Sequence, residues 1–275
     1  MPEEIRDGLR TKCIGKDILY FDAIDSTNAE AKRRAAEGAP EGTVLVAEEQ
    51  GKGRGRLERP FFTPREKGIW FSVILRPKFL PQEAPKCTLM AAVAVAMAME
   101  KFGLRAGIKW PNDILHDGKK LVGILTEMSA EMDCINYVVI GTGINVNFAP
   151  EDFPEELRQV ATSLFVMKGE KLPRAKLLQK VLEAMDELYL TASEKGFAPV
   201  MEMWKDYSVT LGHEVQVIGI GEGGSFSGLA ADIDEEGALL VDTSEGRRRV
   251  LAGDVSIRPK GGGRQDGRKS RDLGF

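Results

Sequence analysis

Glycine and arginine alternate in the segment Gln50-Gly51-Lys52-Gly53-Arg54-Gly55-Arg56, a pattern that does not suit a packed core. The segment directly follows 43–48, a short apolar run that predicts a β-strand. Glycine lets a backbone approach a ligand closely, and arginine supplies a planar, permanently charged fork that matches phosphate and carboxylate oxygens. The pattern therefore predicts an anion-binding loop mounted on a sheet. A plain surface loop or an Arg-Gly nucleic-acid tail has the same letters, so other segments must decide.

Composition narrows the class of protein. The 275 residues are 43% hydrophobic and 29% charged, which is typical of one large or two smaller soluble domains, and the net charge of −4 gives no overall basic field. Three cysteines without a CxxC pair and two histidines argue against a disulfide framework, a zinc site and a Ser-His-Asp triad. No signal peptide is visible, and the longest apolar run, 87–99, is shorter than the about 20 residues of a membrane span. We expect a cytoplasmic protein with no membrane partner.

The apolar periodicity predicts alternating strands and helices, then a change of pattern near Leu211. Strands are expected at 18–21, 43–48, 69–75, 107–110, 120–127 and 137–146, and helices from Ser26 or Thr27 (with a capping box formed with Glu30) to Gly38, at 85–102, at 173–193 and at 197–207. Short β-like runs at 214–220, 224–232, 238–242 and 248–251 predict a small barrel. This divides the chain into a lead (1–16), a main domain (17–211), a barrel domain (212–258) and a disordered tail (259–275).

Two further segments place polar or glycine residues beside expected strands. Asp25-Ser-Thr-Asn28 lies at a strand-to-helix junction, where free backbone N–H groups and short polar side chains could read a ligand rich in amide groups. An ordinary helix cap is the plainer explanation. Gly141-Thr-Gly-Ile-Asn-Val-Asn147 follows a buried strand, and its first two glycines would let a flat ligand lie against the backbone. It is not a dinucleotide fingerprint, because Val146 stands where the third glycine belongs.

The segment Lys109-Trp110-Pro111-Asn112-Asp113 carries more information. Lys109 ends a strand that the pattern predicts to be buried, so its charge needs a partner. Pro111 fixes the backbone and holds Trp110 extended. Asn112 and Asp113 are expected to hold the turn through their side chains. A turn with a solvated lysine is the plainer alternative.

In this order the four segments, with Gly123–Glu127 and the run 228–240, resemble the biotin protein ligases of bacteria and archaea over roughly residues 14–258. The resemblance implies an α+β fold, in which a mixed sheet with flanking helices forms the ligase domain and a small SH3-like β-barrel follows. The short stretch before Asp25 implies a member without the family's N-terminal DNA-binding domain, and hence no specific DNA partner.

The resemblance implies two half-reactions: biotin and MgATP give biotinyl-5′-AMP, and a lysine of a biotin carboxyl carrier protein then takes the biotin. It implies that the loop closes over the adenylate and that the barrel domain assists closure or carrier docking. The carrier is expected to dock by β-pairing at an exposed edge of the sheet. A homodimer through the same edge is a further expectation, and no magnesium ligand is assigned. The implied biotin-binding residues are Ser26, Thr27, Asn28, Gln50, Arg54, Gly55, Arg56, Lys109, Gly141 and Gly143. The implied adenylate-binding residues are Arg54, Arg56, Lys109 and Asn145, and the implied catalytic residues are Lys109, Arg54 and Arg56.

Three positions depart from the pattern of many relatives. Leu57 continues the loop differently, Glu58 replaces a glycine, and Phe61 stands at a tryptophan position and loses its N–H donor. Lipoate ligase or octanoyl transferase is the nearest alternative function, and a repressor that senses biotinyl-adenylate is another. An inactive binding module is disfavoured because Arg54 and Lys109 are intact, as is Arg56.

Overall fold

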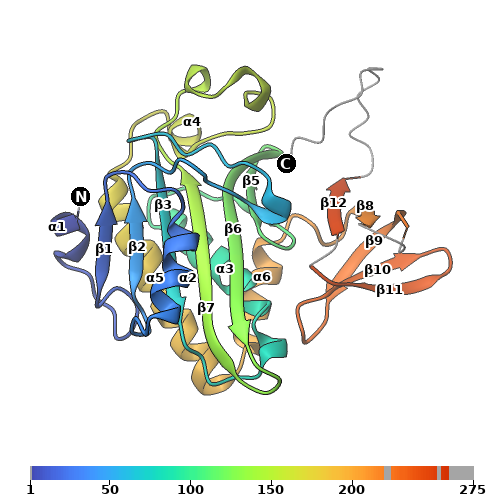
Figure 1. The fold of residues 1–275 in the computed structure, drawn as a ribbon. Coiled ribbons are helices and arrows are strands. Elements are labelled where there is room, and N and C mark those ends of the chain that lie inside the picture. The colour runs from blue at the N-terminus through green and yellow to red at the C-terminus, as the bar shows by residue number, and fades with distance from the viewer. Residues whose placement is uncertain (1, 220–223, 253–254, 260–275) are drawn as a thin grey trace.

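The computed structural model describes residues 2–219, 224–252 and 255–259 (Figure 1). The helices are α1 (Pro2–Arg6), α2 (Thr27–Ala36), α3 (Lys86–Glu100), α4 (Leu164–Lys168), α5 (Arg174–Lys195) and α6 (Ala198–Tyr207). The strands are β1 (Ile18–Phe21), β2 (Val44–Ala47), β3 (Gly68–Leu75), β4 (Gly107–Lys109), β5 (Asp113–His116), β6 (Lys119–Ala130), β7 (Ile135–Asn145), β8 (Glu214–Gly219), β9 (Phe226–Ile233), β10 (Leu239–Thr243), β11 (Gly246–Val250) and β12 (Val255–Pro259). The expected tail 259–275 lies outside the described residues from position 260 onward.

The first seven strands form one mixed sheet in the order β1-β2-β3-β7-β6-β5-β4. β1 and β2 run parallel, and the other neighbouring pairs in this sheet are antiparallel. Helices α3, α5 and α6 cover one face, whereas α2 lies on the opposite face (Figure 1). The predicted α+β fold, with a mixed sheet and flanking helices, is confirmed.

Burial on both faces explains the continuous apolar run of β3. All eight of its residues are buried, because side chains alternate between the two faces of a strand. Ile69, Phe71 and Val73 belong to the large core under α3, α5 and α6, whereas Ile74 packs with Leu45 beneath α2. The expected strands and long helices are confirmed, while α1, α4, β5 and β12 were not foreseen.

The start of α2 is fixed by Ser26, which confirms the expected boundary. Its Oγ accepts a hydrogen bond from the backbone N–H of Ala29 at 3.4 Å. The expected capping box of Thr27 and Glu30 is wrong, because the Glu30 carboxylate instead accepts from Arg33 and Arg34 on the next turn. With the helix starting there, the buried side chains of Thr27 and Asn28 point at the sheet rather than at solvent.

The N-terminal segment packs on α5. Ile5 and Ile14 are fully buried in the main core. The carboxylate of Asp186, on α5, accepts three backbone N–H groups, from residues 12, 13 and 14, at 2.7, 2.8 and 2.7 Å. The residues set apart as a lead, 1–16, are thus held to the main domain by both apolar and polar contacts.

The second domain is a five-stranded antiparallel sheet in the order β11-β10-β9-β8-β12. The pairings among the described residues include none between β11 and β12, so they record an open sheet where a closed barrel was expected. Its buried side chains, including Val215 and Leu239, belong to the same apolar cluster as the main core. The proposed boundary at Leu211 falls in the connection between α6 and β8.

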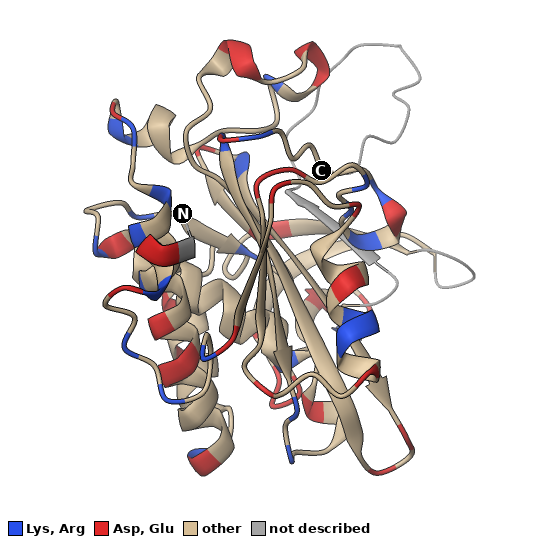
Figure 2. Ribbon diagram, turned by 60° about the vertical axis from the view of Figure 1, so that its left-hand side comes forward, with Lys and Arg blue, Asp and Glu red and all other residues tan. Residues whose placement is uncertain are grey.

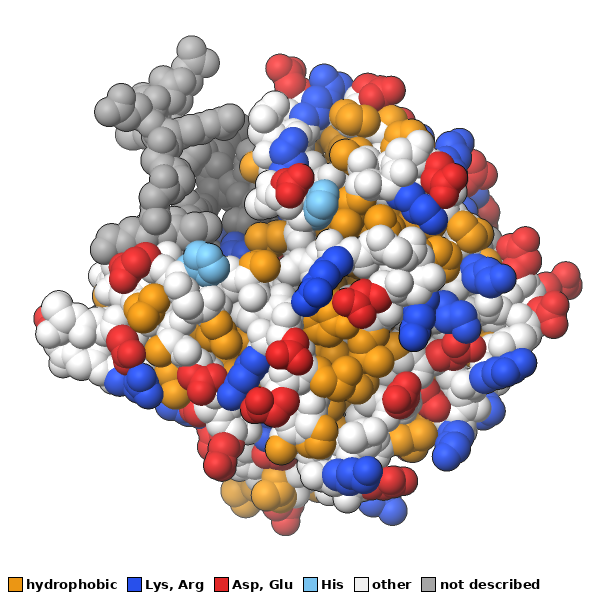
Figure 3. Space-filling model, turned by 180° about the vertical axis from the view of Figure 1, so that it is seen from behind, with side chains coloured by type: hydrophobic (Ala, Val, Ile, Leu, Met, Phe, Trp, Pro, Cys, Tyr) orange, Lys and Arg blue, Asp and Glu red, His pale blue; other side chains and the backbone are white. Residues whose placement is uncertain are grey.

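Charges of both signs are interspersed along the helices and loops, whereas the long strands are mostly uncharged (Figure 2). Seen from behind, apolar side chains show between charged ones of both signs (Figure 3). Within the described ranges, no helix has both the length and the hydropathy needed to cross a membrane.

Candidate functional site

Two adjoining pockets lie where the N-terminus of α2, the loop after β2 and the strands β5, β6 and β7 meet. Four residues line both pockets: Gly55, Phe61, Asn112 and Lys120. We call the first the amide pocket; its other lining residues include Ser26, Thr27, Asn28, Gln50, Arg54, Gly123, Leu125, Gly141 and Gly143. We call the second the aromatic pocket; its other lining residues include Arg56, Phe62, Lys109, Trp110, Asp113, Asn145, Phe153 and Leu157. Every residue predicted from the sequence to touch a ligand lines one of these two pockets.

The floor is sheet backbone with glycines at its centre. A Cβ on Gly141 would come within 2.0 Å of Asn28 Oδ1, and one on Gly143 within 2.7 Å of the Phe61 ring. Gly123, the cross-strand partner of Gly143, has the same ring 2.9 Å from an added Cβ. The glycines thus leave room for two side chains that shape the pockets, where we expected room for the ligand itself.

A hydrogen-bond network fixes the polar wall of the amide pocket. The Gln50 amide oxygen accepts from both the N–H and the Oγ of Thr27, at 2.8 and 3.0 Å. The hydroxyl of Ser72, on β3, lies 2.8 Å from Thr27 Oγ1 and 2.6 Å from Asn28 Oδ1 and can donate a hydrogen bond to either. Ser72 was missed from the sequence, although it is the one polar residue in the run 69–75. Amide and hydroxyl groups held in this way suit a ligand with its own amide-like donors and acceptors.

Glu127, quoted in the sequence motif without a role, closes this network. Its carboxylate accepts from Asn28 Nδ2 at 2.9 Å and pairs with Lys32 at 2.5 Å, and Arg54 lies 3.7 Å away. Burial acts to raise the pKa of Glu127, but the bonds from Lys32 and Asn28 outweigh it, and the pKa lies below its ordinary value. Glu127 is therefore an anion that orients Asn28.

The two arginines of the loop serve different pockets. Arg54 lines the amide pocket and binds both carboxylate oxygens of Glu58, at 3.0 and 2.8 Å. Arg56 lines the aromatic pocket, donates to Asn112 Oδ1 at 3.3 Å and donates to the carbonyl of Ala252 in the second domain. Glu58 has φ +55°, in the left-handed region that favours glycine.

Lys120 is a second pocket residue that the sequence did not reveal. Its ammonium pairs with Asp113 at 2.8 Å and lies 5.7 Å from the centre of the Phe61 ring. Lys120 lines both pockets, whereas Lys109 lines the aromatic pocket. Asp113 begins β5 and holds this lysine, so its expected role in a turn is wrong.

The far wall of the aromatic pocket is built from the chain after β7. Asn145 is buried, and its Nδ2 donates to the carbonyl of Thr162 at 3.0 Å. Phe153 stacks on Phe148, with ring centres 4.5 Å apart. Flat apolar side chains beside an oriented amide suit a heteroaromatic ring.

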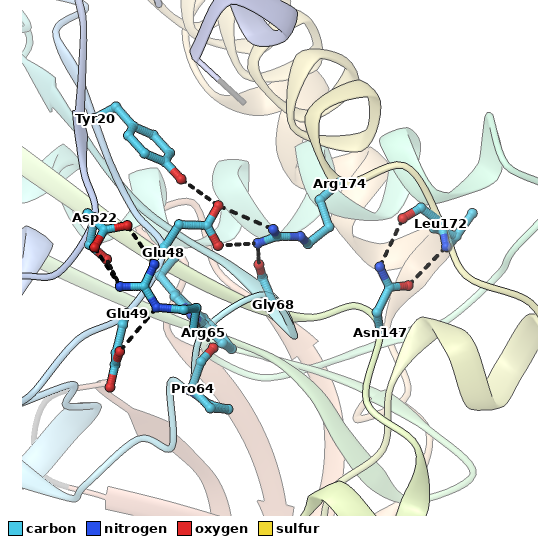
Figure 4. Close-up of polar contacts among 11 residues, drawn as sticks. Tyr20, Asp22, Glu48, Glu49, Pro64, Arg65, Gly68, Asn147, Leu172 and Arg174 are labelled. Atoms are coloured by element: carbon cyan, nitrogen blue, oxygen red, sulfur yellow. Dashed lines mark hydrogen bonds and ion pairs between the residues drawn. The ribbon is translucent and has the colours of Figure 1, made fainter.

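A buried ion pair fastens both ends of the loop (Figure 4). Glu48, just after β2, accepts from Arg174 at 2.9 and 3.2 Å and from the Tyr20 hydroxyl at 2.5 Å. Arg174, the first residue of α5, also donates to the carbonyl of Gly68, where β3 begins after the loop, at 2.9 Å. The guanidinium of Arg174 therefore binds the chain at both ends of the loop, at Glu48 and at Gly68.

A second, more exposed arginine supports the same base (Figure 4). Arg65 binds both carboxylate oxygens of Asp22, at 2.5 and 2.6 Å, and lies 3.7 Å from Glu49. Together the two arginines hold the stem of the loop that carries the Gly-Arg tip. Among the residues that the structure describes, no group of three His, Cys, Asp or Glu could hold a metal ion.

Family profiles match both parts of the chain. Residues 20–145 match the profile described as "Biotin/lipoate A/B protein ligase family", and residues 210–258 match "Biotin protein ligase C terminal domain". The first match covers the loop and most of both pockets, and the second covers the small antiparallel sheet.

Relatives align over most of their length. The chain is 44% identical to the bifunctional ligase/repressor BirA of Bacillus subtilis, over 92% of this chain and 78% of that protein. It is 34% identical to the biotin–[acetyl-CoA-carboxylase] ligase of Mycobacterium tuberculosis, over 84% and 85% of the two chains. A solved structure of the Aquifex aeolicus biotin protein ligase with biotin and ATP superposes with a TM-score of 0.78 at 31% identity, covering 89% of this chain and all of that one.

The buried pair of Glu48 and Arg174 makes a prediction about stability. Burial acts to raise the pKa of Glu48, but hydrogen bonds from Arg174 and Tyr20 hold it below the ordinary value. A lowered carboxyl pKa stabilises the fold above the ordinary pKa, and this contribution is lost as the pH falls through the folded-state pKa. Glu48→Gln should therefore cost about 3 kcal/mol in urea unfolding at pH 7, and the cost should shrink in acid.

Glu49→Gln is the matched control for this measurement. Glu49 is adjacent but half-exposed, and its nearest cation is 3.7 Å away, so the free energy of unfolding should change by less than about 1 kcal/mol. A cost of Glu48→Gln that did not vary with pH would contradict the ion-pair interpretation.

Proposed function

Because the chain belongs to the biotin protein ligase family, we infer that it is an ATP-dependent ligase that activates biotin as biotinyl-5′-AMP and transfers the biotin to a lysine of a carrier protein. The observation that carries this function is the junction of the two pockets. One pocket offers amide and hydroxyl groups, the other offers aromatic rings and an oriented amide, and they share Lys120. We assign biotin to the amide pocket and the adenine and ribose to the aromatic pocket.

In the first step, a carboxylate oxygen of biotin attacks the α-phosphorus of ATP, and the bond to the β-phosphate oxygen breaks to release pyrophosphate. Two anions must approach each other, so fixed cations lower the barrier. Lys120 from β6 supplies charge at the junction, and Lys109 from β4 and Arg56 from the loop add two further cations from the aromatic pocket. Magnesium is proposed to enter with ATP as MgATP.

Arg54 would reach the biotin side of the mixed anhydride, since it lines the amide pocket beside Glu127. Closing the Gly-Arg tip over the product would shield the adenylate from water. The stem held by Arg174 gives the tip a fixed hinge. Loop closure on ligand binding stays a prediction.

In the second step, the ε-amino group of the carrier lysine attacks the biotinyl carbonyl carbon, and AMP leaves. A groove beside the site offers an approach: it runs along β6 from Ile124 to Met128, past Pro85 just before α3 and Thr88 within it, to Gly237 of the second domain. The described pairings of β5 with β6 end at Gly123, and Ile124 still bonds Asn112 through its N–H and its carbonyl, so the edge of β6 opens only after Ile124. We propose that the carrier adds a strand to this edge.

Lipoate ligase remains the alternative with the same fold. We favour biotin because the Gly-Arg loop and the Lys-Trp-Pro-Asn-Asp segment both line the pockets, and a binding shift with biotin rather than lipoate would decide. A homodimer through the β6 edge, a cytoplasmic location and the lack of a specific DNA partner stay predictions.

Lys120 at the junction and Lys109 in the aromatic pocket should both be needed for fast activation. We expect Lys120→Ala and Lys109→Ala each to slow biotin-dependent ATP–pyrophosphate exchange by a factor of about 10² to 10³, since one lost electrostatic contact in a transition state costs about 3–4 kcal/mol. Lys119→Ala is the matched control, because its ammonium makes an exposed contact with the carbonyl of Arg158. Near-normal exchange in Lys109→Ala would remove that residue from the reacting centre.

The close contact between Gly141 and Asn28 predicts a selective loss of biotin binding. In Gly141→Ala the new methyl group would overlap Asn28 Oδ1, so Asn28 must leave its bond with Ser72. We expect the Kd for biotin, measured by calorimetry, to rise about 10- to 100-fold, the effect of one or two lost hydrogen bonds. The KM for ATP in the same variant is the internal control, and an unchanged biotin Kd would contradict this prediction.

The groove beside β6 predicts a defect confined to the second step. Met128 lines it and is 49% exposed. Met128→Glu should raise the KM for the carrier protein, by introducing a charge into an apolar contact, and leave ATP–pyrophosphate exchange unchanged. Met132→Glu, at a residue 98% exposed in the turn after β6, is the matched control. Equal effects of the two substitutions would argue against docking at this edge.

A further inference from the structure

A tight turn of the second domain packs against the main domain beside the pockets. It is the β9–β10 turn, residues 234–237. The carboxylate of Asp234 accepts the backbone N–H groups of Glu236 and Ala238, at 3.0 and 2.9 Å, and the side chain of Arg249 binds both Asp234 and Glu236. Gly237 has φ +80°, which suits glycine. The turn is therefore a rigid element, closed by the bond from the Gly237 N–H to the Asp234 carbonyl, with the carbonyls of Glu235 and Gly237 pointing outward.

Two of these carbonyls accept hydrogen bonds from buried side chains of the main domain. Trp110 Nε1 donates to the carbonyl of Gly237 at 3.0 Å, and Lys86 Nζ donates to the carbonyl of Glu235 at 2.8 Å. Trp110 is 1% exposed and Lys86 is 5% exposed. A Cβ on Gly237 would lie 2.9 Å from Leu89 of α3. Close packing and two buried bonds thus fix the turn against α3 and the end of β4.

The turn is one residue away from the chemistry. Trp110 directly follows Lys109, and both line the aromatic pocket. The backbone N–H of Trp110 donates to Thr210 Oγ1 at 2.9 Å, so Trp110 is held at its main chain and at its indole. Its indole partner comes from the second domain. A shift of the turn should therefore move Trp110, and with it the backbone of the preceding residue, Lys109.

Lys86 offers an independent handle on the turn, because it lines neither pocket. Its ammonium has a carboxylate partner in Glu83 at 2.7 Å and the ring of Phe197 at 5.1 Å. A lysine this buried keeps its charge through such partners, and the Glu235 carbonyl is the partner that lies in the second domain. Lys86 therefore connects the N-terminus of α3 with the turn.

We infer that the 234–237 turn positions Lys109 for biotin activation, and that Trp110 and Lys86 are positioning residues that act through its carbonyls. The inference rests on the proposed function, and it assigns the second domain a role in the first half-reaction as well as in carrier docking. A misplacement of about 1 Å at a reacting group can cost 10²-fold in rate, so a modest shift of the turn is enough to matter.

The test is steady-state ATP–pyrophosphate exchange by the full chain. Trp110→Phe keeps the apolar ring and removes the indole donor, and Lys86→Met keeps the aliphatic stem and removes the ammonium. We expect each to lower kcat about tenfold, the effect of one lost hydrogen bond of ordinary strength, and to leave the KM for biotin unchanged. Because both residues act through one turn, the double variant should lower kcat by a factor smaller than the product of the two single factors.

Lys205→Met is the matched control. Lys205 of α6 also reaches the second domain, at Asp232, 3.1 Å away, but not through the turn. It should retain normal kcat. Slowing equal to that of Lys86→Met would mean that any loosening between the domains suffices, and would overturn the assignment to the turn.

Hydrogen exchange gives a readout that a merely structural role would not move. Lys86→Met should speed amide exchange at Ile108 and Lys109 at a temperature where global unfolding is negligible, and Lys205→Met should not. Normal kcat and normal exchange at these amides in Lys86→Met would overturn the inference. Absence of biotin-dependent activity in the unmodified chain would instead count against the proposed function, so the two failures are distinguishable.

Discussion

The site depends on a stretch of sheet that carries no side chains on one face. Gly123 and Gly143 are cross-strand partners in β6 and β7, and Gly141 follows the same face of β7. Glycine in a central strand weakens the sheet, so this floor has a cost in stability. The gain is distance: Asn28 and Phe61 come within van der Waals contact of the backbone, where a methyl group would stop them. The pockets have their depth because these three positions lack a Cβ.

The second constraint is charge. Lys120, Lys109 and Arg56 come from β6, β4 and the loop, and all three line the aromatic pocket. Like charges repel more strongly where water is scarce, so part of the cost is met by Asp113, which pairs with Lys120 at 2.8 Å. The rest favours the arrival of anions. A carboxylate and a triphosphate relieve the repulsion among the cations, and the cations in turn relieve the repulsion between carboxylate and phosphate.

Sequence reasoning found what local patterns encode, and it found every expected ligand residue on the walls of the pockets. It missed Lys120 for a specific reason. Strict alternation from Gly123 would direct Lys120 toward the helices, but β6 has an irregularity opposite Ile114 and Leu115. Leu121 and Val122 consequently both pack in the main core, and the extra residue turns Lys120 to the site. A bulge changes which face a side chain takes, and alternation alone does not reveal it.

The contacts between the domains were also beyond sequence reasoning, because the second domain contributes main-chain atoms. The carbonyls of Glu235, Gly237 and Ala252 accept from Lys86, Trp110 and Arg56. A carbonyl carries no side-chain signature, so the sequence of the second domain reveals only the residues that shape the turn, Asp234, Gly237 and Arg249, and not the contacts that its carbonyls make. The side chains that define these contacts are the donors of the main domain, and two of them, Trp110 and Arg56, line the aromatic pocket. Arg56 from the loop and Trp110 at the end of β4 thus both donate to carbonyls of the second domain, which holds these two parts of the aromatic pocket in one fixed arrangement.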